Sequence, residues 1–125
     1  MTQEDRYLLI KDLSARLPYR VLVHYCNKKH TLYTNDFVLD ERLLIEFRCS
    51  DCCVELKPYL RPLSSMTEEE KKEYCDLQDR FLCSSQYPVT EAYALFDWLN
   101  KNHFDFRGLI PKGLAIEVTK DNPYK

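Results

Sequence analysis

Lys57-Pro-Tyr-Leu-Arg-Pro-Leu-Ser-Ser-Met-Thr-Glu-Glu-Glu70 is the stretch that divides this 125-residue chain into two unlike halves. The hydroxyl of Thr67 can accept a hydrogen bond from the amide of Glu70, and the Glu70 carboxylate can accept one from the amide of Thr67. This capping box, with acidic side chains at the positive helix end, predicts that a helix begins here. Pro58 and Pro62 predict an extended connector over residues 57–66. Strands are expected before the connector and helices after it.

The chain before this stretch has the pattern of one helix followed by short strands. Leucines recur at helical spacing in residues 1–17, up to Pro18, and predict a helix. Residues 19–26 are β-branched and aromatic and alternate in polarity, which predicts a strand with one buried face. Further strands are expected at residues 30–34, 43–49 and 53–56. Residues 19–56 are therefore predicted to be a strand-rich half that forms an antiparallel meander.

After the connector, residues 67–102 are predicted to form two helices, and residues 103–125 an irregular segment with a final strand. The second of these helices is the more apolar, and its main stripe consists of Ala92, Leu95, Phe96 and Leu99. It is therefore expected to be the central core helix that covers the sheet. The predicted fold class is α+β, a single domain in which an antiparallel meander of three to five strands packs against about three helices.

Composition argues against several function classes. Only two glycines occur, so no glycine-rich loop can surround a phosphate with backbone amides. The N-terminal sequence is acidic and is followed by a short apolar run, which fits neither a signal peptide nor a membrane span. A cytoplasmic protein is expected, in which the six cysteines stay reduced.

The net charge of −2 conceals a local imbalance. Residues 63–83 hold six acids against three bases, so the helix predicted there carries a negative field. A nucleic-acid-binding module needs the opposite, several cations that neutralise phosphates. Such a patch would have to be assembled in the strand-rich half, from Arg20, Lys28, Lys29, Arg42, Arg48, Lys57 and Arg61. A nucleic-acid partner is therefore an alternative that the sequence does not favour.

Two segments resemble known proteins. Residues 57–70, quoted above, and Asp97-Trp-Leu-Asn-Lys-Asn-His-Phe-Asp-Phe-Arg-Gly-Leu-Ile-Pro-Lys-Gly-Leu114 are similar to recurrent stretches in short uncharacterised proteins of gut Bacteroidota, often encoded near prophage or mobile-element genes. That family has no assigned activity, so the resemblance implies no catalytic residue and no ligand. It implies a phage-associated or accessory binding role rather than housekeeping metabolism.

The cysteines offer one candidate metal site. In Cys49-Ser-Asp-Cys52 the two-residue gap lets both thiolates reach one tetrahedral zinc at about 2.3 Å. Cys26 and His30, separated by three residues, are the candidates for the remaining ligands. The sequence contains no second Cys-x-x-Cys pair, so only two of the four ligands of a structural zinc site come from this motif. The favoured interpretation is that the thiols pack without metal, and no cofactor is predicted.

His103 is the candidate for acid–base or nucleophile-activating chemistry, because cysteines elsewhere in the chain offer a Cys–His pair. Its position, where the helix over residues 90–101 ends, is also explained by interaction with the last helix carbonyls. Asp105 and Arg107 are expected to form a local ion pair. No catalytic residue is predicted, and the chain is expected not to be an enzyme.

Nine tyrosines are many for so small a chain, and tyrosine is enriched at protein interfaces. Tyr19, Tyr25, Tyr33 and Tyr59 are the partner-binding candidates in and beside the meander. Two interpretations stay open: an exposed binding face, or ordinary packing of tyrosine in strands.

These observations favour a non-enzymatic, protein-binding accessory protein, such as a phage- or mobile-element-associated adaptor or inhibitor. A nucleic-acid-binding module and a small zinc-stabilised domain are the alternatives. The partner and the oligomeric state have no signal in the sequence.

Overall fold

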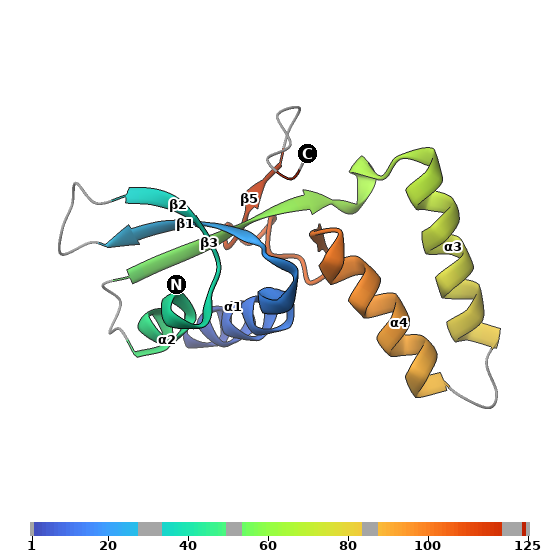
Figure 1. Ribbon diagram of the computed structural model, residues 1–125, viewed down its shortest axis with the longest axis horizontal. Coiled ribbons are helices and arrows are strands. Elements are labelled where there is room, and N and C mark those ends of the chain that lie inside the picture. The colour runs from blue at the N-terminus through green and yellow to red at the C-terminus, as the bar shows by residue number, and fades with distance from the viewer. Residues whose placement is uncertain (1, 28–33, 50–53, 84–87, 119–123, 125) are drawn as a thin grey trace.

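The computed structural model describes residues 2–27, 34–49, 54–83, 88–118 and Tyr124 (Figure 1). In these ranges four α-helices and a five-stranded mixed sheet form a single α+β domain, which confirms the predicted fold class. The elements are α1 (Gln3–Arg16), η1 (Leu17–Tyr19), β1 (Leu22–Asn27), β2 (Thr34–Val38), α2 (Glu41–Cys49), β3 (Val54–Pro62), η2 (Leu63–Ser65), α3 (Glu68–Cys83), α4 (Pro88–Lys101), β4 (Phe104–Asp105) and β5 (Ile116–Glu117).

The sheet is an antiparallel meander extended by two short parallel strands. β1 lies between β2 and β3, and β3 continues past the end of β1 to pair in parallel with β4 and β5. The amide of Arg61 donates to the His103 carbonyl, whereas the carbonyl of Leu60 accepts from the Val118 amide. Since neighbouring residues of a strand direct their backbone groups to opposite edges, β4 and β5 lie on opposite edges of β3.

Helices α1 and α2 both lie against one face of this sheet (Figure 1). Side chains of β3 are buried at every second residue, as expected for a strand with one covered face. Leu9 and Leu13 of α1 are fully buried in this main core, and Phe47 of α2 is almost so. The opposite face carries the half-exposed His24 and Tyr59. No helix of the described residues covers this second face, which is called the open face below.

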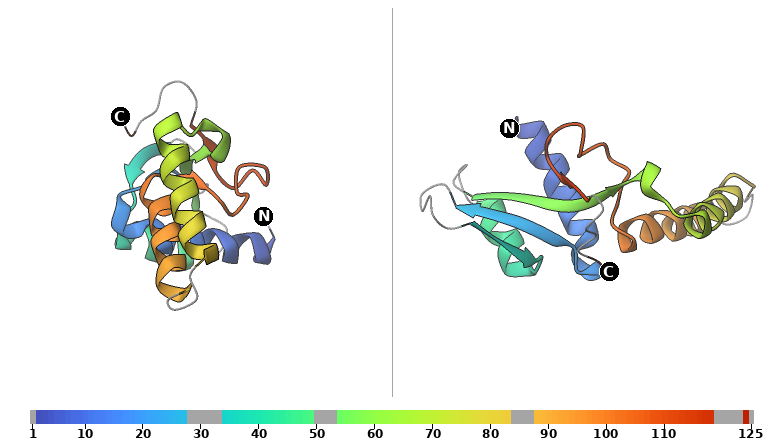
Figure 2. Two further views of the ribbon diagram at one scale, coloured as in Figure 1. Left: turned by 90° about the vertical axis from the view of Figure 1, so that its right-hand side faces the viewer. Right: turned by 90° about the horizontal axis from the view of Figure 1, so that it is seen from above.

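Helices α3 and α4 form an antiparallel hairpin that extends away from the sheet (Figures 1 and 2). The predicted capping box is confirmed: the Thr67 amide donates to Glu70 Oε1 at 3.0 Å, and the Glu70 amide donates to Thr67 Oγ1 at 3.2 Å. Arg61 of β3 donates twice to the same Glu70 carboxylate, at 2.7 and 2.8 Å. These bonds outweigh partial burial and lower the pKa of Glu70. They also fasten the hairpin to β3.

Two predicted segments are wrong. Residues 43–49, expected as a strand, belong to helix α2, in which Leu44 and Phe47 are buried one turn apart. The connector expected over residues 57–66 is instead mostly strand, because β3 runs through to Pro62. Pro58 is tolerated there because its missing N–H would face away from β1, at a position outside the β1–β3 hydrogen bonds.

The prediction that the apolar helix after residue 90 covers the sheet is also wrong: α4 is not the central core helix. Its buried residues Leu95 and Leu99 pack in a separate small cluster with Met66 and Phe104, against Tyr74, Leu77, Trp98 and Phe106. The apolar stripe of α4 is therefore used against α3, and α1, the less apolar helix, covers the sheet.

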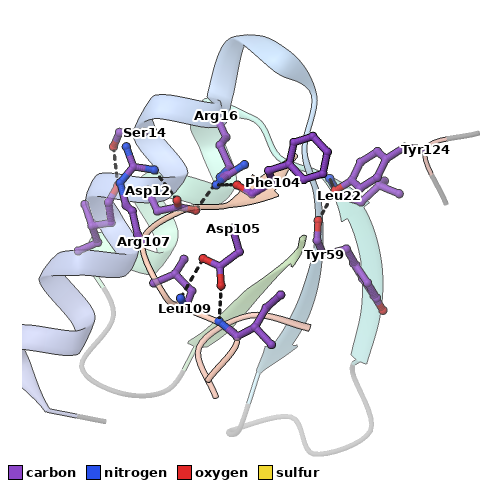
Figure 3. Close-up of polar contacts among 12 residues, drawn as sticks. Asp12, Ser14, Arg16, Leu22, Tyr59, Phe104, Asp105, Arg107, Leu109 and Tyr124 are labelled. Atoms are coloured by element: carbon purple, nitrogen blue, oxygen red, sulfur yellow. Dashed lines mark hydrogen bonds and ion pairs between the residues drawn. The ribbon is translucent and has the colours of Figure 1, made fainter. Parts of the chain in front are cut away.

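A buried network of charges joins α1 to the segment after α4 (Figure 3). Asp12 and Arg16 are fully buried, and Arg16 Nε donates to Asp12 Oδ2 at 2.9 Å. Arg107 donates to the other Asp12 oxygen at 2.6 Å, and Arg16 Nη2 donates to the Phe104 carbonyl at 2.5 Å. Arg107 therefore pairs with Asp12, and the predicted ion pair between Asp105 and Arg107 is wrong. Asp105 instead accepts from two backbone amides, of Leu109 and Ile110.

Tyr124 completes the sheet where β1 and β3 separate. The ladder of β1 and β3 predicts that the Leu22 amide bonds to the Tyr59 carbonyl, two residues beyond the His24–Lys57 pair. Instead the Tyr124 hydroxyl lies between them, accepting from the Leu22 amide at 2.9 Å and donating to the Tyr59 carbonyl at 2.7 Å (Figure 3). One hydroxyl therefore replaces one ladder hydrogen bond.

The variant Tyr124→Phe should lower the free energy of unfolding by about 1–3 kcal/mol, because both backbone groups lose their partner in a partly buried place. Urea unfolding followed by circular dichroism measures this difference. Tyr7→Phe, at a tyrosine that is 72% exposed on α1, is the matched control and should change stability by less than about 0.5 kcal/mol. Equal effects of the two variants would contradict the bridging role.

Candidate functional site

The candidate zinc ligands are divided between described and undescribed residues. Cys52 and His30 lie outside the described residues. Cys26 is half-buried in β1, and Cys49 is exposed at the end of α2. Within the described ranges, no group of three or more His, Cys, Asp or Glu side chains is arranged to hold a metal ion. The described residues therefore supply no zinc site, and the hypothesis rests on the sequence spacing alone.

The three described tyrosine candidates are not gathered on one face. Tyr25 is 5% exposed on the helix-covered face, where its hydroxyl donates to Glu46 at 2.7 Å. Tyr59 is on the open face, where burial and then Asp36, which accepts from its hydroxyl at 3.0 Å, raise its pKa. Tyr19 lies in η1 beside Asp97 of α4, and Tyr33 lies outside the described residues. A shared tyrosine surface is not formed by the described three.

Some of the described basic residues of the first half are already engaged within the chain. Arg61 is engaged by Glu70, and Lys57 is 3.2 Å from Glu55. Arg42 and Arg48 are exposed on α2, and Lys28 and Lys29 lie outside the described residues. Two of the described cations are thus already paired with acids of the same chain.

His103 is 8% exposed, and its ring stacks on the Tyr124 ring with centroids 3.7 Å apart. Its φ of 62° marks the end of α4. Burial, followed by the nearby charges of Arg16 and Arg61, lowers its pKa from 6.5 to about 4. This histidine packs against Tyr124, and its Nδ1 has no hydrogen-bond partner among the described residues. The expected interaction of its side chain with the last carbonyls of α4 is not found among the described contacts; only its backbone amide bonds there, to the Asn100 carbonyl.

A groove of about 400 Å³ lies between β2 and α2. Its lining consists of Tyr25, Phe37, Val38, Asp40, Arg42, Leu43 and Glu46. The rings of Tyr25 and Phe37 meet edge to face, 6.0 Å apart, and provide aromatic surface. The volume is in the range of sites that hold a small ligand or one large side chain.

The outer edge of β2 borders this groove. The Leu39 amide donates to the Val21 carbonyl, so the backbone groups of residues 35, 37 and 39 face β1. Those of Asp36 and Val38 consequently face away from the sheet. The Asp36 amide is held by the adjacent Asn35 side chain at 2.8 Å, and no strand of the described chain pairs with this edge. An unpaired edge is a template for another strand.

Some of the charged side chains that line the groove already have hydrogen-bond partners within the chain. Asp40 caps α2 by accepting from the Leu43 amide at 2.8 Å, and Glu46 accepts from Tyr25. The Arg42 guanidinium is exposed and has no hydrogen-bond or ion-pair partner among the residues that the structure describes. Arg42 is thus the lining charge left for a ligand.

Sequence reasoning missed this site because it assigned residues 43–49 to a strand. The signal was present: Asp40 followed by Leu43, Leu44 and Phe47 is an N-cap before apolar residues at helical spacing. With a helix there, the second strand of the meander becomes an edge flanked by a helix.

Comparisons of the chain with protein-family models, curated proteins and solved structures find no match. Within the described part of the chain, none of the helices has both the length and the apolar character needed to cross a membrane.

Proposed function

We propose that this protein is a non-enzymatic protein-binding module that captures an extended segment of a partner by strand addition to β2. The observation that carries the proposal is the combination of an unpaired strand edge with an adjoining groove of about 400 Å³. Backbone hydrogen bonds to the edge supply affinity, and a pocket for alternate side chains supplies specificity.

The groove chemistry defines the expected segment. An aliphatic or aromatic side chain fits against Phe37 and Leu43, because burying it removes apolar surface from water. Arg42 pairs with a carboxylate near that anchor, since a guanidinium binds a carboxylate with two parallel hydrogen bonds. The partner is therefore an extended segment in which an acidic residue lies close to a large apolar one.

The proposal also includes the cellular compartment and the biological context of the protein. We expect a cytoplasmic accessory protein, an adaptor or inhibitor associated with a phage or mobile element. Support comes from the resemblance of residues 57–70 and 97–114 to such proteins, and from free thiols at Cys26, Cys49 and Cys75. Free thiols are typical of a reducing compartment.

A library of random displayed peptides tests the proposal directly. Enriched peptides should share an apolar residue near an acidic one, and their affinity should fall at least about tenfold in Val38→Pro, which removes an outward N–H. Val38→Ala is the matched control, because it shortens the same side chain but keeps the N–H. Enriched peptides that bind both variants equally would contradict strand addition.

The role of Arg42 is tested with the same peptides. Arg42→Ala should weaken binding several-fold and reduce its dependence on salt, because one charge pair is lost. Arg48→Ala, which removes the same charge from the same helix outside the groove, should leave affinity unchanged. If the two variants bind the peptides alike, the proposal that Arg42 pairs with an acidic residue of the partner is wrong.

A further inference from the structure

A cluster of three polar side chains lies on the open face of the sheet, at the edge strand β2 (Figure 1). His24 Nδ1 donates to Asp36 Oδ1 at 2.8 Å, and the Tyr59 hydroxyl donates to the same oxygen at 3.0 Å. The other carboxylate oxygen, Oδ2, has no hydrogen-bond or ion-pair partner among the residues that the structure describes. The Asp36 carboxylate is therefore held in place through one oxygen, and its second oxygen is left for a ligand.

The charges around this carboxylate are otherwise engaged. Lys57 shares the open face, in register with His24, but its ammonium group is 3.2 Å from Glu55 of its own strand. Arg42 lines the groove, on the side of the sheet that the helices cover. His24 carries a positive charge only when it is protonated. Asp36 is therefore an acidic point on the open face, at the strand edge where the proposed partner segment is added.

An added strand brings its own side chains to Asp36. The backbone groups of Asp36 face away from the sheet, so in an antiparallel addition the Cα atom of the residue opposite lies about 5.5 Å from that of Asp36. Successive residues of a strand point to opposite faces. A segment that places its apolar anchor in the groove beside Phe37 consequently places the residues before and after the anchor on the open face. One of these two residues lies opposite Asp36.

From these observations we infer that Asp36 determines specificity at the strand-binding edge by pairing with a lysine or arginine next to the apolar anchor of the partner. The inference rests on the proposed function, because a partner strand must lie along β2 to reach Asp36. Opposite charges on neighbouring strands stabilise their pairing, and a carboxylate already fixed by His24 and Tyr59 loses little side-chain freedom on binding. The partner segment thus carries its apolar and acidic residues on one face and its basic residue on the other.

The peptides enriched from the displayed library provide the test. Lysine or arginine should occur directly before or after the apolar anchor more often than two residues away from it. A double-mutant cycle then combines Asp36→Asn with glutamine at the basic position of a synthetic peptide. Asp36→Asn keeps an oxygen that accepts from His24 and Tyr59 but removes the charge. It should weaken binding of the basic peptide about two- to fivefold and leave the affinity for the glutamine peptide unchanged.

Glu117→Gln is the matched control, because it removes an exposed acidic charge from β5, which pairs with β3 and not with β2. It should change the affinity for the basic and glutamine peptides equally. Circular dichroism confirms that each variant is folded. Enriched peptides without a basic residue next to the anchor would overturn the inference, as would an Asp36→Asn variant that binds both peptides with equally changed affinity.

The inference and the proposed function fail in different ways. If Val38→Pro and Val38→Ala bind the enriched peptides equally, or if no peptide is enriched, strand addition is wrong and the inference is wrong with it. If Val38→Pro alone loses binding but the cycle shows no coupling between Asp36 and the basic residue, strand addition stands. In that case only the role of Asp36 is wrong.

Discussion

Asp12→Ala should lower the free energy of unfolding by about 3–5 kcal/mol, the largest effect of any single exchange that we predict. Asp12 is fully buried and accepts from both Arg16 and Arg107. Removing the carboxylate leaves the fully buried Arg16 guanidinium with no opposite charge in contact, and an unpaired buried charge is more costly than a missing pair. Chemical denaturation monitored by circular dichroism gives the value.

A second variant separates charge from packing. In Asp12→Ala with Arg16→Met, the buried cation is removed together with its partner, so much of the lost stability should return. Glu4→Ala, in the exposed first turn of the same helix, is the control and should change stability by less than about 1 kcal/mol. A double variant less stable than Asp12→Ala alone would show that Arg16 acts through its bond to the Phe104 carbonyl instead.

Acidification should weaken the fold through His103. Its pKa is about 4 in the folded chain and near 6.5 when unfolded, so between these values the unfolded state binds the extra proton. Stability is therefore fully present above pH 6.5 and falls as the pH drops through this window, by about 3 kcal/mol at pH 4. The cause is burial, reinforced by the charges of Arg16 and Arg61.

The matched variant is His103→Asn, which does not titrate and tolerates the left-handed backbone at φ 62°. Denaturation curves at pH 7 and pH 4 should show a smaller loss for this variant than for the wild type, by about 3 kcal/mol. Other acid-sensitive groups, such as Glu70, affect both chains equally. Parallel pH profiles of the two proteins would contradict the assignment to His103.

Sequence patterns correctly predicted features that depend only on residues close together in the chain, such as helix caps. The capping box at Thr67 is confirmed, as is the helix that begins after it. The prediction for residues 43–49 was wrong because a short apolar run suits strand and helix alike, and the N-cap at Asp40, which distinguishes them, was overlooked. The prediction that Pro58 ends the strand was wrong because the destabilisation by a proline in a strand depends on which edge its nitrogen faces.

The groove and the buried network depend on contacts between distant residues, which no local pattern carries. Asp12 reads as an ordinary polar residue of α1, yet its partner Arg107 is 95 residues away. Likewise, the apolar pattern of α4 correctly predicted burial but could not tell whether the sheet or α3 would cover it. Assigning α2 correctly would have been enough to suggest a helix beside an edge strand.

The contacts that Asp12, Arg16 and Leu22 make across the chain also determine when it can fold during synthesis. Arg16 reaches Phe104, 88 residues later, and the Leu22 amide reaches Tyr124, 102 residues later. Helix α1 can form early on the ribosome, but its buried charges have no complete set of partners until Phe104 and Arg107 emerge. Loop closure over such distances is slow and leaves apolar surface exposed meanwhile. Nascent chains arrested before residue 104 has emerged should therefore be more sensitive to protease than chains in which residues 104–107 have emerged.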